Sequence, residues 1–108
     1  MSYKVKSIPK FERELKRLAK KYISLKTEYQ SLVQSLKEHP EQGTPLGNDC
    51  YKIRMAISSK GKGKSGGARV ITCFKIMNET VYLLTIFDKS DQENIADKEL
   101  RELLKFID

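Results

Sequence analysis

Cysteine, histidine and tryptophan are scarce in this chain of 108 residues, which has two cysteines, one histidine and no tryptophan. Cys50 and Cys73 lack the Cys-x-x-Cys spacing of zinc or thioredoxin-like sites, and no histidine stands near them. We therefore expect two inert free thiols in a reducing cytoplasm, and no metal site. His39 stands beside Pro40 in an acidic turn, where we expect a solvated loop residue and not a catalytic group.

Long hydrophobic runs are also missing. No apolar stretch approaches the roughly 18 residues that a membrane-spanning helix needs. The charged start, residues 1–6, is not followed by the apolar stretch of a signal peptide. We therefore expect a cytoplasmic protein with no membrane association. The length of 108 residues fits one domain, residues 1–108, and the 39% hydrophobic content indicates a folded chain.

Acidic residues are few in two long parts of the chain, and the net charge is +7. Residues 1–37 hold ten Lys or Arg and three Asp or Glu, and residues 50–89 hold eight cations and two acids. Residues 38–49 and 90–108 each carry an excess of three acids. A basic protein attracts nucleic acid or other polyanions. We expect a polyanion to contact the two basic blocks and to avoid the last block.

The segment 58–69 contains four cations, four glycines and no acid, and it separates two strand-like runs. Glycines let the backbone approach a polyanion, and the cations attract it. The tripeptide Gly63-Lys64-Ser65 is similar to the end of a phosphate-binding P-loop, but Ser58 stands where the first glycine should be. The segment also leads into a strand and not a helix. We interpret it as an RNA contact; a charged hairpin loop without function is the alternative.

The first part of the chain is predicted to form a strand and a helical hairpin. Residues 3–8 alternate like a short strand, and Pro9 suits the first turn of a helix. Apolar residues then recur at three- and four-residue spacing in two runs, and Ser24 can serve as the N-cap of the second. The short connection between the two runs predicts an antiparallel helical hairpin.

The second part is predicted to form three strands and a helix. The strands cover residues 51–57, 70–76 and 81–87. Ser90 with Glu93 forms a capping-box pattern that predicts the start of a final helix. The order β-α-α-β-β-β-α predicts an α+β domain, in which helices back one face of an antiparallel sheet and the other face stays open.

Four stretches carry a specific resemblance to a known family. They are Tyr51-Lys52-Ile53-Arg54, the run from Gly61 to Arg69-Val70-Ile71, Val81-Tyr82-Leu83-Leu84-Thr85, and Asp88-Lys89-Ser90. Together they resemble the RelE/HigB branch of the RelE/ParE toxins of bacterial type II toxin–antitoxin systems, over nearly the whole chain. The resemblance implies a RelE-like microbial ribonuclease fold and a metal-independent, cofactor-free mRNA interferase. Its implied partners are messenger RNA, the ribosome, and a cognate antitoxin that covers the toxin.

Ribonucleases of this type let a ribose 2′-OH attack the neighbouring phosphate, and fixed cations stabilise the charge of the transition state. Arg69 is the first candidate for clamping the scissile phosphate with its planar fork, and Arg54 is the second. Lys52 and Lys89 are the next catalytic candidates. The candidates for binding flanking RNA are Lys60, Lys62, Lys64, Lys75 and Tyr82.

The general base is open at this stage. RelE-like members commonly place a tyrosine or histidine among the catalytic groups, but residues 105–108 contain neither, and Phe87 stands where related chains often have a tyrosine. A lysine crowded by other cations has its ammonium form disfavoured and can serve as a base. Lys89, Lys52 and Asp91 are the candidates.

Two other functional classes remain. A ParE-like toxin would share the fold but poison DNA gyrase through protein contacts, and a non-catalytic module would only bind nucleic acid. The cations also have structural alternatives: Lys52 and Arg54 as edge charges that prevent aggregation, and Arg69 as the ion-pair partner of Asp88 or Glu79. The cationic loop and the basic sheet face favour the nuclease.

Overall fold

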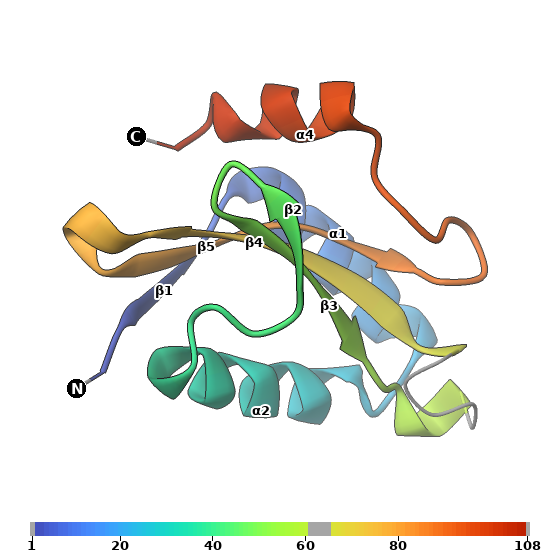
Figure 1. Cartoon of the computed structure of the whole chain (residues 1–108). Helices are drawn as coiled ribbons and strands as arrows, with labels where there is room; N and C mark the ends of the chain where they lie inside the picture. The colour runs from blue at the N-terminus through green and yellow to red at the C-terminus, as the bar shows by residue number, and fades with distance from the viewer. Residues whose placement is uncertain (1, 61–65, 108) are drawn as a thin grey trace.

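The computed structural model describes residues 2–60 and 66–107 and shows a sheet between two layers of helix (Figure 1). The regular elements are β1 (Lys4–Ser7), α1 (Pro9–Lys21), α2 (Leu25–Glu38), β2 (Thr44–Gly47), β3 (Cys50–Met55), β4 (Ala68–Lys75), β5 (Thr80–Asp88) and α4 (Asp97–Leu104). Short 3₁₀ turns, η1 (Ser58–Lys60) and η2 (Ile76–Asn78), flank β4. In the described residues no helix is both long and apolar enough to span a membrane.

The five strands are ordered β1-β5-β4-β3-β2 in one sheet. The four predicted strands are confirmed as β1, β3, β4 and β5, and these last three pair antiparallel as expected. Two features differ from the prediction. The segment 44–47, with its proline and glycine, forms a fifth strand against β3. β1 lies parallel to β5, so the sheet is mixed. The two helices and three strands between β1 and β5 allow this parallel pairing, which a tight turn cannot make.

The predicted helical hairpin covers one face of the sheet. Its apolar stripe is fully buried at Phe11, Leu25 and Leu36. On the sheet, Ile53 and Ile86 both pair with Val70, so three buried aliphatic side chains line up across β3, β4 and β5. Burying such side chains stabilises the fold by about 1.5–3 kcal/mol each.

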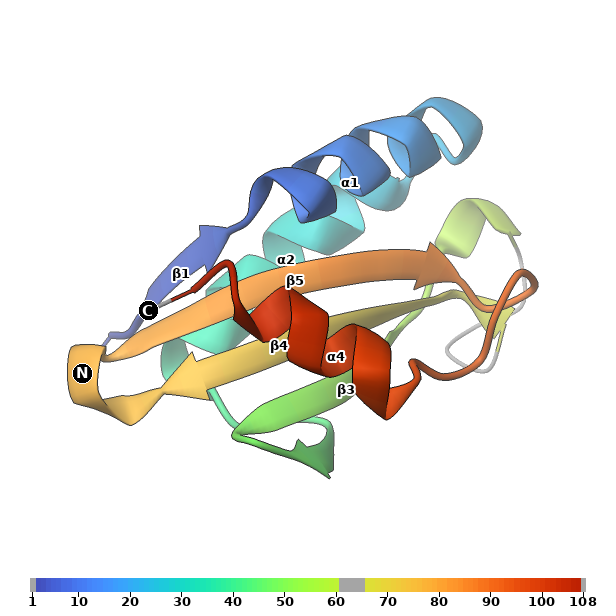
Figure 2. The same ribbon diagram turned by 90° about the horizontal axis from the view of Figure 1, so that it is seen from above.

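The sequence predicted that the opposite face of the sheet stays open, but this face is covered in part. Figures 1 and 2 show α4 crossing this face, on the other side of the sheet from α2. Leu100 and Leu103 of α4 are buried. The chain between β5 and α4 also lies on this side, since two of its residues bond to side chains of β3 and β4. The basic face is therefore covered in part by the acidic C-terminal block.

The predicted capping box is wrong. α4 begins at Asp97 with Ala96 before it, several residues after Ser90 and Glu93. The backbone N–H and the hydroxyl of Ser90 donate to Asp88, and Glu93 accepts from Arg69. Hydrogen bonds to ionised groups are about twice as strong as neutral ones. Ser90 and Glu93 therefore bond to these charged partners and do not cap a helix.

Candidate nucleic-acid interface

Two arginines stand opposite each other on neighbouring strands. Arg54 of β3 pairs directly with Arg69 of β4 in the antiparallel ladder. Directly opposed residues point to the same face of a sheet, so the expectation that the two arginines share a face is confirmed. Lys52, two residues before Arg54, lies on this face too. Arg54 is exposed, whereas Arg69 is only 1% exposed.

Arg69 is buried because the chain after β5 lies over it. Its Nε donates to Glu93 Oε2 at 2.9 Å, and its Nη1 donates to the Ala68 carbonyl at 3.2 Å. Next to this pair, the ammonium group of Lys52 donates to the side-chain oxygen of Asn94. The expectation of an uncovered Arg69 is therefore wrong. The alternative of a structural ion pair named Asp88 or Glu79, whereas the ion pair of Arg69 in the described residues is with Glu93.

The pKa of the Glu93 carboxyl group depends on several cations of this face. Desolvation raises the pKa of Glu93, and the hydrogen bond and the charge of Arg69 lower it. The charges of Lys89 and Lys52 lower the same pKa further, and the net result lies below the ordinary value. Three of the four predicted catalytic cations thus act on one carboxylate. We call Lys52, Arg54, Arg69 and Lys89 the cationic cluster.

Lys89 joins the cluster through the backbone. Its N–H donates to the Gly67 carbonyl at 3.0 Å, which extends the pairing of β4 with β5 by one step beyond Ala68 and Asp88. Alternation along β5 places Lys89 on the same face as Phe87, the residue that pairs with Arg69. The end of β5 therefore carries the fourth cation to the face of the other three.

Lys60 is held by a buried acid. Its ammonium group forms an ion pair with Asp88, whose side chain is completely buried, and donates to the Gly66 carbonyl at 2.7 Å. Asp88 also accepts from the hydroxyl of Tyr22 and from Ser90. Burial raises the pKa of Asp88, but the bonds from Lys60, Ser90 and Tyr22 lower it well below its usual range. Lys60 thus anchors the start of the glycine-rich segment to the end of β5, and its contact with flanking RNA phosphates stays a prediction.

Gly67, at the end of the glycine-rich segment, has a packing role. A Cβ atom at Gly67 would lie 2.1 Å from the Met55 carbonyl oxygen, which is far inside contact distance. Only glycine lets the backbone entering β4 come this close to β3. Lys62 and Lys64, two of the predicted RNA contacts, lie outside the described residues.

Three predicted residues lie away from the cluster. Lys75 is six residues from Arg69 along β4, about 20 Å at the rise of an extended strand. Tyr82 pairs with Cys73, and its hydroxyl accepts from the Asn78 amide at 3.2 Å. Asp91 is exposed and lines a polar hollow of about 350 Å³ against α1, beside residues such as Arg17 and Lys21. His39 is exposed at the end of α2, as expected.

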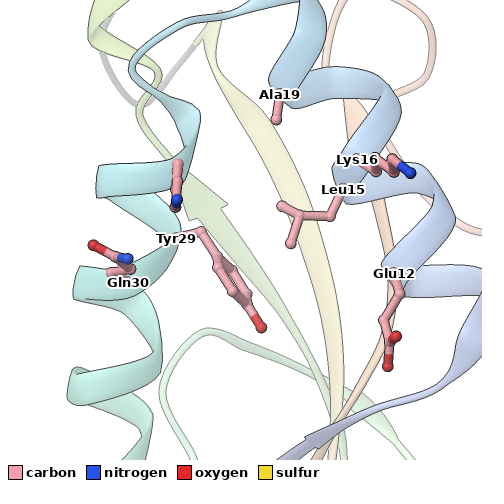
Figure 3. Close-up of a pocket in the computed structure, with 7 residues that line it drawn as sticks. Glu12, Leu15, Lys16, Ala19, Tyr29 and Gln30 are labelled. Carbon is pink, nitrogen blue, oxygen red and sulfur yellow. The ribbon is translucent and has the colours of Figure 1, made fainter.

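An apolar hollow of about 330 Å³ lies between α1 and α2. Figure 3 shows Leu15 and the Tyr29 ring pointing into the space between the two helices, with Glu12 and Lys16 at its rim. Burial is the main cause that raises the pKa of Tyr29. The hollow belongs to the hairpin side of the sheet, so it is separate from the cationic cluster.

Glu93 is the site residue that sequence reasoning missed. It was assigned to a helix cap because of its spacing from Ser90. The available signal was the charge pattern: residues 90–108 hold six acids and three cations directly after a strongly basic block. Within residues 2–60 and 66–107, no group of three or more His, Cys, Asp or Glu side chains could hold a metal ion.

A mixed five-stranded sheet has a helical hairpin on one face and, on the other, paired arginines beside the connection that leads to α4, and this α+β arrangement is that of the small RelE-like toxins. Residues 10–107 match the family model described as the RelE toxin of the RelE/RelB toxin–antitoxin system, and the chain belongs to this family. The fold is similar to that of a mutant of the E. coli toxin RelE in the free state, with a TM-score of 0.66 and 16% identity over 99% of each chain. It is also similar to a chain of the toxin–antitoxin complex RelBE2 from Mycobacterium tuberculosis, with a TM-score of 0.61 and 18% identity over 82% of this chain and 92% of the other.

Proposed function

We propose that this RelE-family protein is an endoribonuclease that cleaves messenger RNA and thereby inhibits translation. The observation that carries the proposal is the convergence of Arg69, Lys52 and Lys89 on the Glu93 carboxylate, with Arg54 paired to Arg69. Fixed cations on one sheet face provide the charge stabilisation that a pentavalent phosphorane requires. Family membership supports the same activity, since RelE toxins are known as nucleases.

In this proposal the Glu93 carboxylate marks the position of an RNA phosphate. A carboxylate and a phosphate both offer oxygen acceptors to the guanidinium fork of arginine. Arg69 is buried and would lose the ion pair with Glu93 if this side chain simply left, which is costly. Exchange of the carboxylate for a phosphate keeps Arg69 paired throughout. Glu93, whose side chain is 45% exposed, can leave without disturbing the core.

The catalytic roles follow from the positions of the cations. Arg69 holds the scissile phosphate, and Arg54 stabilises the charge that develops when the 2′-OH attacks. Lys52 and Lys89, whose charges lower the pKa of the same carboxylate, are the candidates for proton transfer. The lowered pKa of Glu93 suits a permanent anion and not a base at neutral pH. Asp91 faces the α1 hollow, so it is the weaker candidate.

The proposed partners are a cognate antitoxin, messenger RNA and the ribosome, all in the cytoplasm. The similar M. tuberculosis protein is part of a toxin–antitoxin complex, which supports an antitoxin for this chain. An acidic antitoxin segment suits the cationic cluster, because the chain's own Glu93 already binds there.

A brief induction of the protein in bacteria, followed by sequencing of mRNA 3′ ends, tests the proposal. The nuclease predicts new 3′ ends within coding regions and arrested translation. A ParE-like gyrase poison instead predicts double-strand DNA breaks and a DNA-damage response with unchanged mRNA ends. A non-catalytic binding module predicts neither outcome. It predicts only that the logarithm of the binding constant falls with the logarithm of the salt concentration, with a slope near −0.7 per single-strand phosphate neutralised.

A further inference from the structure

The two cysteines of this chain lie directly opposite each other. Cys50 of β3 pairs with Cys73 of β4 in the antiparallel ladder. Both are free thiols, and both are buried, with exposed fractions of 1% and 0%. In the sequence the two cysteines are far apart and lack a redox motif, so we expected only inert core residues. Their juxtaposition changes that interpretation.

The backbone hydrogen bonds define the geometry of the pair. The N–H of Phe74 donates to the Asp49 carbonyl at 2.9 Å, so Asp49 and Phe74 form a hydrogen-bonded pair. The next pair, Cys50 and Cys73, is therefore a non-hydrogen-bonded pair, in which Cα atoms are about 4.5 Å apart and side chains are closest. A disulfide needs a Cα separation of about 4.4–6.8 Å. A non-hydrogen-bonded pair of this kind lies at the short, strained end of that range.

The side chains also meet. The sulfur atoms of Cys50 and Cys73 lie 3.4 Å and 3.8 Å from the same acceptor, the Asn48 carbonyl oxygen. Asn48 and Asp49 have φ values of 54° and 62°, and this left-handed turn places that carbonyl beside both sulfurs. A hydrogen bond between the thiols lowers the pKa of Cys73 and raises that of Cys50. This hydrogen bond favours a thiolate at Cys73 and couples the ionisation of the two thiols.

We infer that Cys50 and Cys73 are a redox-active pair that forms a reversible cross-strand disulfide. With a peroxide as oxidant, the Cys73 thiolate attacks one peroxide oxygen, and the O–O bond breaks to give a sulfenic acid and water. The Cys50 thiolate then attacks the Cys73 sulfur, the S–O bond breaks, and a second water leaves. The two thiols lose two electrons and two protons, and the peroxide accepts both. A small thiol such as glutathione reverses the reaction by thiol–disulfide exchange.

Access to the pair is through the edge of the sheet. β2 is a four-residue edge strand, and its register with β3 shifts between Pro45 and Gly47. Short edge elements open locally at a much smaller free-energy cost than the whole fold. Opening of β2 and β3 away from β4 exposes both Cys50 and Cys73 while β4, β5 and β1 stay paired. A strained disulfide is also easier to reduce than a structural one.

The disulfide would act on the part of the sheet that carries the cationic cluster. The pairs Cys50–Cys73 and Arg54–Arg69 lie on the same face of the same two strands, four residues apart along each. A covalent bond at the first pair fixes the register of β3 against β4. The redox chemistry itself does not depend on the proposed nuclease activity, so each can fail without the other.

Intact-mass spectrometry of the purified full-length protein tests the inference. Treatment of the native protein with hydrogen peroxide should lower the mass by about 2 Da, with loss of both thiols together, and glutathione should restore it. Cys50→Ala should abolish this change and leave Cys73 to gain oxygen. A wild-type protein that stays reduced, gains oxygen on one cysteine or forms only intermolecular disulfides would overturn the inference.

A second measurement uses the wild type alone, because a variant of a buried cysteine can fail to fold. The protein is equilibrated over a series of ratios of reduced to oxidised glutathione, and its circular dichroism is recorded in parallel. One transition between the dithiol and the intramolecular disulfide, with a native spectrum, is expected. Accumulation of glutathione adducts, or no transition while the protein stays folded, contradicts the inference.

Discussion

Arg69 and Glu93 form an ion pair whose two members differ sharply in exposure: the Arg69 side chain is 1% exposed and the Glu93 side chain 45%. The buried member is fixed in the sheet by its position in β4 and by its bond to the Ala68 carbonyl. The exposed member lies on the connection between β5 and α4. In any exchange of partners, the arginine therefore stays in place and the carboxylate moves.

The first prediction concerns Arg69. Arg69→Lys keeps a positive charge but loses the planar fork, so the rate of RNA cleavage should fall by about two orders of magnitude. Growth arrest on induction should weaken accordingly. Lysine is the informative replacement because Arg69→Ala would also leave a gap in a buried position. The matched control is Arg101→Lys on the exposed surface of α4, which should leave toxicity unchanged. Equal toxicity of both variants removes Arg69 from the mechanism.

The second prediction concerns Glu93. Glu93→Gln removes the charge that competes with phosphate at Arg69, so binding of a short RNA oligonucleotide should tighten several-fold. Glu99→Gln, at an exposed site in the first turn of α4, changes the net charge by the same amount and is the control. Fluorescence anisotropy at matched salt measures both. If the two variants bind equally, net charge alone explains the change and Glu93 does not compete with RNA.

The third prediction concerns the acid stability of the Asp88 network. Because the fold lowers the pKa of Asp88, the unfolded state binds more protons in acid, where the ordinary pKa is about 3.9. The contribution of Asp88 is therefore fully present above about pH 5 and is lost as the pH falls through and below 3.9. Asp88→Asn should cost about 3–5 kcal/mol at neutral pH by leaving Lys60 with no anion, and should flatten this part of the acid dependence.

Urea unfolding at about pH 7, pH 5 and pH 3 measures this effect. Asp91→Asn, at an exposed position three residues further on, is the control and should shift stability by no more than about 0.5 kcal/mol. An Asp88→Asn variant as stable as the wild type at neutral pH would show that the network does not hold the fold.

The fourth prediction concerns Gly67. Gly67→Ala places a Cβ 2.1 Å from the Met55 carbonyl, so β3 and β4 must separate at the end that carries Arg54 and Arg69. The unfolding temperature should drop, and RNA cleavage should fall even at temperatures where the variant is folded. Thermal melts with cleavage assays check both effects. A variant with wild-type stability would mean that the strands can shift freely at this point.

The sequence predicted the elements of the fold better than their connections. Alternation and spacing located four strands and three helices, because each pattern depends only on neighbouring residues. Thr44–Gly47 was missed, since proline and glycine hide a short edge strand that exists only through its pairing with β3. The parallel pairing of β1 with β5 depends on residues more than 70 positions apart and leaves no local pattern.

The candidate site was predictable in part for the same reason. The glycine-rich run before Arg69 and the alternation around Arg54 indicated a shared cationic face, and the register confirms that face. The bonds from Arg69 to Glu93 and from Lys60 to Asp88 span 24 and 28 residues, so only the fold reveals them. Glu93 in particular matched a local capping motif and was assigned to the wrong partner.

The most direct test of the central claim is an NMR titration that follows the Nε–H resonance of Arg69. The ligand is an RNA oligonucleotide whose 2′-OH groups are methylated, so that none of them can attack the neighbouring phosphate. We expect the Arg69 Nε–H resonance to shift as RNA is added until the shift saturates. The backbone signals of Glu93 and Asn94 should shift in parallel, because these two residues leave the cationic cluster. Shifts confined to the basic surface of α1, at Arg13 and Arg17, with an unchanged Arg69 signal would contradict the claim.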